Sequence, residues 1–136
     1  MVIKKKSDFA SIVEAIIKND AGEILLLKRS NHNTFFTGLW QLAGGKVEFG
    51  ENIESAVKRE IFEETGCNCI NSKLEKVFSF YEEFNGFKGT LFLMVYSCEI
   101  NDSIKLSKDH DEFGFFSMTQ IKKMKLAPIS KKAIFG

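Results

Sequence analysis

The amino-acid sequence predicts a mixed α/β sandwich built on a mixed β-sheet. Several short apolar stretches have the length and the β-branched or aromatic composition of strands. One central stretch, Ile53–Thr65, favours a helix, with Asn52 suited to its N-cap and Gly66 to its end. Ser117–Met124 is expected to form a second, capped helix. Strands mixed with one strong helix are typical of this class, and the length of 136 residues suits a single domain over residues 1–136.

Two strands and a glycine pair precede the central helix. Ile12–Lys18 and Glu23–Lys28 are apolar runs that flank the turn residues Asn19–Gly22, so we expect them to pair as a hairpin. A polar loop then leads through Leu39–Leu42 to the pair Gly44-Gly45.

Two further strands, Leu74–Phe84 and Thr90–Ile100, follow the central helix. The dipeptide Asn85-Gly86 between them is a strong hairpin signal. The second of these strands is apolar on both faces, which indicates a central position in a covered sheet. Phe113–Phe116 fits one more short strand, and the tail from residue 128 to 136 is ambiguous.

Composition excludes several classes of protein. A net charge of +1 provides no field strong enough for nucleic acid or a membrane surface to be the main partner. The chain lacks an apolar run of membrane-spanning length, and its start, MVIKKKSDF, does not resemble a signal peptide, so we expect a cytoplasmic protein. Three cysteines and two histidines poorly support a zinc site, and we interpret the cysteines as small buried hydrophobes in a reducing compartment.

Three glutamates, Glu60, Glu63 and Glu64, share one face of the central helix because they are spaced i, i+3 and i+4. A solvated acidic stripe is the ordinary interpretation of such a cluster. At about 100° per residue, however, the glutamates continue the apolar face that begins at Ile53 and Val57. We therefore expect these carboxylates to point towards the protein.

An inward acidic cluster is unfavourable without a counter-charge. Like charges one turn apart repel each other, and anions in the last turn of a helix oppose its dipole. A divalent cation would reverse both effects. Because the available ligands are hard oxygens, Mg²⁺ or Mn²⁺ is the expected ion.

The stretch GKVEFGENIESAVKREIFEETGC, Gly45 to Cys67, resembles the Nudix box, G-x5-E-x7-R-E-U-x-E-E-x-G-U with U aliphatic. Upstream, EILLLKRS and GLWQLAGG resemble the family's approach to the box, with Ala43 in place of the usual Pro. The resemblance implies a Nudix-type α/β/α sandwich. It also implies Mg²⁺-dependent hydrolysis of the diphosphate linkage of a nucleoside diphosphate joined to another group. Every fixed position of the pattern is filled, by Gly45, Glu51, Arg59, Glu60, Glu63, Glu64 and Gly66.

The resemblance also implies the metal shell. Glu60 and Glu64 would be the principal ligands, Glu63 would contribute, and the backbone carbonyl of Gly44 or Gly45 would complete the shell. One of the two principal ligands would also accept the proton of the attacking water, and the sequence does not decide which.

Supporting roles follow in the same way. Arg59 would orient the glutamates, and Glu51 would brace the loop before the helix. One more acidic ligand usually comes from a distant loop in this family. Asp109, Asp111 and Glu112 are the candidates, of which we favour Glu112, and an ordinary solvated turn is the alternative.

The substrate is a small nucleotide whose identity the sequence leaves open. Arg29, at the family's arginine position, could meet phosphate or a purine edge, or could be a surface residue at a strand end. Phe35 and Tyr81 could stack on a base, whereas Trp40 is better explained as structural. A small domain of this type resembles nucleoside-triphosphate-hydrolysing members, and nucleotide-sugar, ADP-ribose and dinucleoside polyphosphate hydrolases are alternatives.

Two rivals belong to other functional classes. Nudix domains can serve as nucleotide sensors without turnover, although such domains commonly lose box glutamates. An α/β domain with an accidental acidic helix, used for protein contacts, is the third possibility. A homodimer is possible because dimers are common in the family.

Overall fold

The structure is a computed structural model that describes residues 9–31, 36–84, 86–101 and 103–136. None of the helices in these ranges combines the length and the apolar character needed to cross a membrane. The elements, in chain order, are β1 (Phe9–Ile17), β2 (Ile24–Arg29), β3 (Trp40–Gln41), β4 (Ala43–Lys46), α1 (Ile53–Thr65), β5 (Cys69–Phe84), β6 (Phe87–Ile100), β7 (His110–Phe116), α2 (Met118–Ile121) and α3 (Pro128–Phe135).

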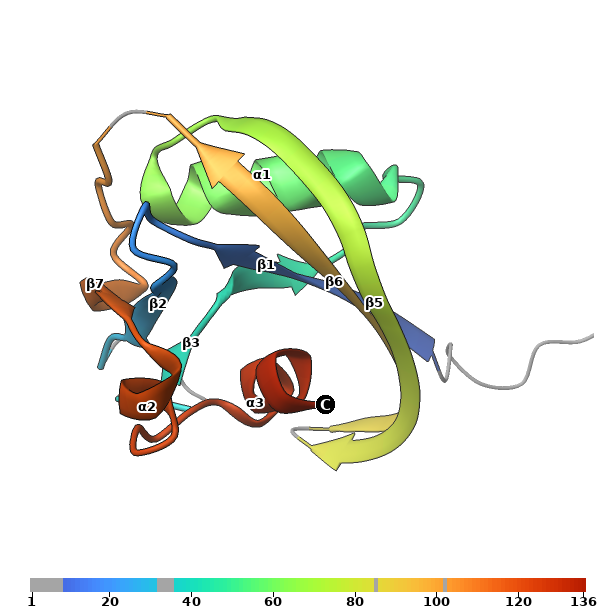
Figure 1. The fold of residues 1–136 in the computed structure, drawn as a ribbon. Coiled ribbons are helices and arrows are strands. Elements are labelled where there is room, and N and C mark those ends of the chain that lie inside the picture. The colour runs from blue at the N-terminus through green and yellow to red at the C-terminus, as the bar shows by residue number, and fades with distance from the viewer. Residues whose placement is uncertain (1–8, 32–35, 85, 102) are drawn as a thin grey trace, which may run out of the picture.

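The described strands form two sheets, a four-stranded one in the order β4-β1-β6-β5 and a three-stranded one in the order β3-β2-β7. The larger sheet is mixed, because β1 runs parallel to β6 and antiparallel to β4. Figure 1 shows α1 on one side of this sheet and α3 on the other. The predicted α/β/α sandwich with a mixed sheet is therefore confirmed, as is the central position of β6.

The predicted hairpin of the first two strands is wrong. The turn forms as expected, since the Asn19 side chain accepts hydrogen bonds from the backbone of Ala21 and Glu23, and Gly22 has a φ of 78°. Beyond this turn, however, β1 and β2 lie in different sheets, and Lys18 and Ile24 form only an isolated bridge. The local residues specify the turn, whereas the distant partners β6 and β7 determine the pairing.

Other boundaries differ by a few residues. The hairpin of β5 and β6 is confirmed around Gly86, with Asn85 outside the described residues, and β5 begins earlier than expected, at Cys69. The helix after β7 is one turn long: Ser117 and Gln120 form a capping box that starts it, and the chain turns after Ile121. The ambiguous tail forms α3, with Pro128 in its first turn.

The core lies on both faces of the larger sheet. On one face Ala56, Val57 and Ile61 of α1 pack in a cluster with β1, β2 and β6. On the other, Ile121 of α2 and Ala133 of α3 pack with the remaining apolar side chains of β2 and β6. Burial of each such aliphatic side chain contributes about 1.5–3 kcal/mol to the stability of the folded state. The first cluster fixes α1 against the sheet beside the glycine pair of β4.

Two smaller expectations concern the cysteines and Trp40. None of the three cysteines forms a disulfide, and the expected burial is confirmed for Cys67 and Cys98, whereas Cys69 is only half-buried. Trp40 packs edge-on against Phe116, with ring centroids 5.2 Å apart, in the second core cluster, which confirms a structural role.

Candidate functional site

Helix α1 has the bounds that the sequence predicts because both caps form. The Asn52 side chain accepts hydrogen bonds from the backbone N–H groups of Glu54 (2.9 Å) and Ser55 (3.3 Å). At the other end Gly66 adopts a φ of 73°, and its N–H donates to the Phe62 carbonyl. These caps hold the acidic residues in the last turns of the helix.

Two of the three helix glutamates point inward. The Glu60 and Glu64 side chains are each 13% exposed, whereas Glu63 is 55% exposed. The expected inward face is thus correct for Glu60 and Glu64 and wrong for Glu63, whose exposed carboxylate accepts a hydrogen bond from Arg59 at 3.3 Å. It is also wrong for Ile53, the first residue of α1, which is 40% exposed.

The glycine pair of β4 adjoins both inward carboxylates. The backbone N–H of Gly44 donates to Glu64 Oε1 at 2.7 Å. A Cβ on Gly45 would lie 2.6 Å from the Glu60 carboxyl carbon, so glycine at this position leaves the carboxylate where it is. The backbone of this strand therefore forms one wall of the acidic site.

The inward carboxylates repel one another and are poorly hydrated. Burial raises the pKa of Glu64 well above its ordinary value, the Gly44 N–H opposes this, and the charges of Glu60 and Glu14 add to it. Burial likewise raises the pKa of Glu60, although Arg59 opposes the shift. Without a further cation, both carboxyl groups are therefore harder to ionise than an exposed glutamate.

Arg59 clamps the loop before α1 to the acidic face. Its Nε and one terminal nitrogen bind the two oxygens of Glu51 at 2.7 and 3.0 Å, and the other terminal nitrogen binds Glu60 Oε1 at 2.8 Å. Glu51 also accepts the N–H of Glu48, and these hydrogen bonds, that of Arg59 foremost, lower its pKa. This geometry fits the orienting role expected of Arg59 and the bracing role expected of Glu51.

The sequence analysis did not identify a further carboxyl group at the site, that of Glu14. Glu14 lies in the middle of β1 and is 5% exposed, and the Ser130 hydroxyl of α3 donates to it at 2.5 Å. Its other oxygen lies against Gly44. Burial raises its pKa to about 8, the Ser130 hydrogen bond opposes this, and the Glu60 charge adds to it. The available signal was a single acidic residue inside the apolar run IVEAII.

The smaller sheet adds one polar side chain from each of its strands. Arg29 of β2 donates to Gln41 Oε1 of β3 at 3.2 Å, and the Gln41 amide nitrogen lies 3.2 Å from Nε2 of His110 in β7. The same His110 nitrogen is 3.9 Å from Glu64 Oε2. The positive charge of Arg29 opposes the rise in the Glu64 pKa, so Arg29 lies near this carboxyl group, and its contact with phosphate or a purine edge stays a prediction.

The run KDHDEF contributes a residue other than the one we favoured. Glu112 lies opposite Lys28 in the β2–β7 register, and adjacent residues of a strand point to opposite faces, so Glu112 is on the sheet face opposite Arg29. Asp109 and Asp111 are exposed, and their negative charges act to raise the pKa of His110. The buried member next to Glu64 is His110, which the sequence prediction passed over.

The acidic site fits a hard divalent cation. Among the described residues, no three acidic, histidine or cysteine side chains already converge as a metal cage. The donors nonetheless suit the ion: two inward carboxylates with raised pKa values, and a glycine backbone without side chains beside them. A bound cation would supply a positive charge that balances the carboxylates of Glu60 and Glu64.

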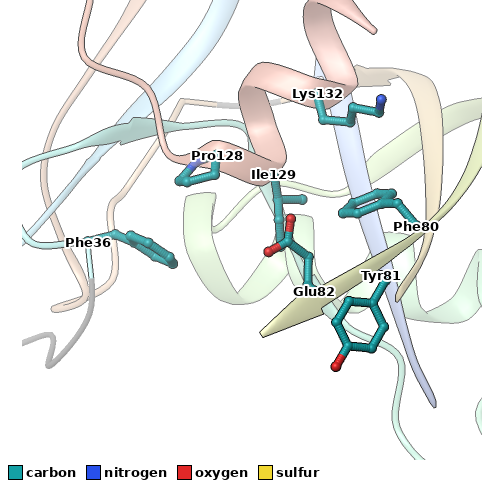
Figure 2. A pocket seen from close by; sticks show the side chains of 7 residues that line it. All are labelled: Phe36, Phe80, Tyr81, Glu82, Pro128, Ile129 and Lys132. Atoms are coloured by element: carbon teal, nitrogen blue, oxygen red, sulfur yellow. The ribbon is translucent and has the colours of Figure 1, made fainter. Parts of the chain in front are cut away.

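A pocket of about 420 Å³ lies between α3 and β5. Figure 2 shows Tyr81 and Phe80 on one side of it, Phe36 at the far side and the start of α3 between them. Tyr81 is 58% exposed, whereas Phe35 lies outside the described residues. The pocket therefore includes Tyr81 of the expected stacking residues. Its lining is Phe36, Phe80, Tyr81, Glu82, Pro128, Ile129 and Lys132.

Comparison with known proteins gives consistent results. Nucleoside triphosphatase NudI of Escherichia fergusonii is 29% identical over 133 residues, which cover 91% of this chain and 93% of that protein. ADP-ribose pyrophosphatase of Methanocaldococcus jannaschii is 35% identical over 117 residues, 85% of this chain and 66% of that protein.

Solved structures show the same similarity. A MutT protein from Methanosarcina mazei matches with a TM-score of 0.76 at 29% identity, over 98% of this chain and 94% of that one. A MutT Nudix hydrolase from Burkholderia pseudomallei matches with a TM-score of 0.79 at 29% identity, over 93% and 95%. The family model of the NUDIX domain matches residues 8–135. With every fixed position of the box filled and its helix in place, this chain belongs to the Nudix hydrolase family.

Proposed function

We propose that this Nudix hydrolase is a nucleoside triphosphate pyrophosphohydrolase, which releases a nucleoside monophosphate and pyrophosphate with the help of Mg²⁺. The observation that carries the proposal is the pair of inward carboxylates, Glu60 and Glu64, beside the cationic Arg29. The identity to a nucleoside triphosphatase over most of both chains supports the substrate class.

The metal site of the proposal consists of Glu60, Glu64 and the backbone carbonyl of Gly44 or Gly45. A divalent cation held there would neutralise the anionic phosphate oxygens and make a water molecule more acidic. Glu63 and Glu112 stay predictions from the resemblance, since the first is half exposed and the second faces away from Arg29.

The chain's own residues then bind and orient the substrate. Arg29 binds phosphate oxygens, since its charge already acts on Glu64 and a guanidinium matches phosphate geometry. The pocket between α3 and β5 takes the nucleobase, where Tyr81 and Phe80 offer aromatic faces. Its volume of about 420 Å³ is in the range of small-ligand sites.

Proton transfer belongs to Glu60 or Glu64. Both carboxyl groups have raised pKa values in the metal-free site, and either could accept a proton from water. Arg59, held by Glu51, keeps Glu60 in place through its 2.8 Å hydrogen bond.

A substrate screen tests the proposal. Purified protein with Mg²⁺ is offered nucleoside triphosphates, oxidised nucleotides, ADP-ribose, nucleotide sugars and dinucleoside polyphosphates, and products are separated by chromatography. We expect release of pyrophosphate from nucleoside triphosphates, at least ~100-fold slower in Glu64→Gln and unchanged in Glu99→Gln, which makes the same substitution at an exposed position.

A second candidate is ADP-ribose hydrolysis, favoured by the 35% identity to the archaeal pyrophosphatase. Faster turnover of ADP-ribose than of any triphosphate would replace our proposal with this one. Nucleotide binding without hydrolysis across the whole panel would instead support a sensor.

A further inference from the structure

A row of three polar side chains, one from each strand of the smaller sheet, leads to Glu64. Arg29 and His110 are opposite each other in the β2–β7 register, and Gln41 of β3 bridges them, with 3.2 Å to each. Gln41 is 9% exposed and His110 5%. Polar groups this deeply buried are normally retained only where their hydrogen bonds matter.

The direction of each hydrogen bond in this row follows from Arg29. A guanidinium can only donate, so the Gln41 atom that faces it must be the carbonyl oxygen. The Gln41 NH₂ group then faces His110 Nε2 and donates to it. His110 Nε2 must therefore be an unprotonated acceptor, and the neutral ring carries its proton on Nδ1. A protonated ring would set two donors against each other.

The other ring nitrogen of His110 provides a second observation. Within the part of the chain that the structure describes, its buried Nδ1 lacks a hydrogen-bond partner. An unsatisfied buried donor is unfavourable, so packing alone does not explain a histidine here.

We propose that Gln41 and His110 are positioning residues that hold the Arg29 guanidinium beside Glu64 for substrate phosphate. The inference rests on the proposed function, in which Arg29 binds phosphate. His110 orients the Gln41 amide, and the Gln41 carbonyl oxygen holds Arg29. An arginine side chain has many rotamers, and fixing it before substrate arrives removes an entropic cost from binding.

The test is a double-mutant cycle measured with a nucleoside triphosphate and Mg²⁺. We expect Gln41→Leu and His110→Phe to raise KM roughly fivefold to tenfold, with kcat within about twofold, because one hydrogen bond that orders Arg29 is lost. His110→Gln, whose side-chain oxygen can also accept from Gln41, should recover most of the loss. In an Arg29→Met background, Gln41→Leu should change KM by less than about twofold.

Binding of inorganic pyrophosphate, measured by calorimetry on the same variants, separates this inference from the proposed function. If the wild type hydrolyses no nucleotide but the cycle shows the same coupling in pyrophosphate affinity, the proposed function fails and the inference stands. Equal effects of Gln41→Leu with and without Arg29 would overturn the inference, as would wild-type KM in Gln41→Leu. Gln41→Leu keeps the test decisive if His110→Phe does not fold, which urea denaturation would reveal.

Discussion

Replacing Glu14 by Gln should stabilise the metal-free protein at neutral pH. The Glu14 carboxyl has an ordinary pKa of 4.5 and a folded-state pKa of about 8, chiefly because of burial. A group with a raised acid pKa holds its proton more tightly in the folded state. Its contribution to stability is therefore complete below pH 4.5 and is lost as the pH rises towards 8. Between pH 4.5 and pH 7, at about 1.4 kcal/mol per pH unit, the loss is roughly 3 kcal/mol.

Glutamine keeps the shape of Glu14 and an oxygen that can accept from Ser130, but it does not titrate. The assay is urea denaturation in a chelating buffer at pH 5, 6, 7 and 8, with Glu99→Gln as the control for an exposed glutamate. The advantage of Glu14→Gln over the wild type should grow by roughly 3 kcal/mol from pH 5 to pH 8. A constant difference across this range would refute the assignment of Glu14 as a buried, protonated group.

Alanine substitutions of the two glycines of β4 should have different effects. A Cβ on Gly44 would meet the Val13 backbone carbonyl, so Gly44→Ala should lower the free energy of unfolding by about 1–3 kcal/mol. In Gly45→Ala the new Cβ meets only the movable Glu60 carboxylate, so calorimetry should show a stability loss below ~1 kcal/mol but Mn²⁺ binding should weaken. Asn52→Ala removes the N-cap of α1 and should cost about 1 kcal/mol in urea denaturation, and an unchanged midpoint would contradict the cap. Tyr81→Ala should raise KM roughly tenfold by loss of base stacking, whereas Tyr81→Phe should keep the wild-type KM; equal KM in both variants would remove Tyr81 from the base site.

The acidic site was largely predictable because it is local. The N-cap, the left-handed glycine and the i, i+4 spacing lie within one helix, and they place Glu60 and Glu64 correctly. The outward orientation of the Glu63 side chain was harder to predict from the sequence, since it depends on which carboxylates Arg59 binds.

The rest of the site depends on contacts between distant segments. His110 approaches Glu64 because a register shift at the Lys28/Arg29 step of the β2–β7 pairing puts it opposite Arg29, and periodicity does not reveal such a shift. The same pairing turns Glu112 away. Glu14 could have been suspected as one charge in an apolar strand, but its contact with Ser130 joins residues 116 positions apart.

Mn²⁺ binding tests the central claim, that Glu60 and Glu64 face inward because a divalent cation belongs between them. Free Mn²⁺ is followed by electron paramagnetic resonance during titration of the wild type, Glu64→Gln and Glu99→Gln. We expect saturable binding to the wild type, the same affinity in Glu99→Gln, and an affinity at least ~10-fold lower in Glu64→Gln. Wild-type affinity in Glu64→Gln would contradict the claim.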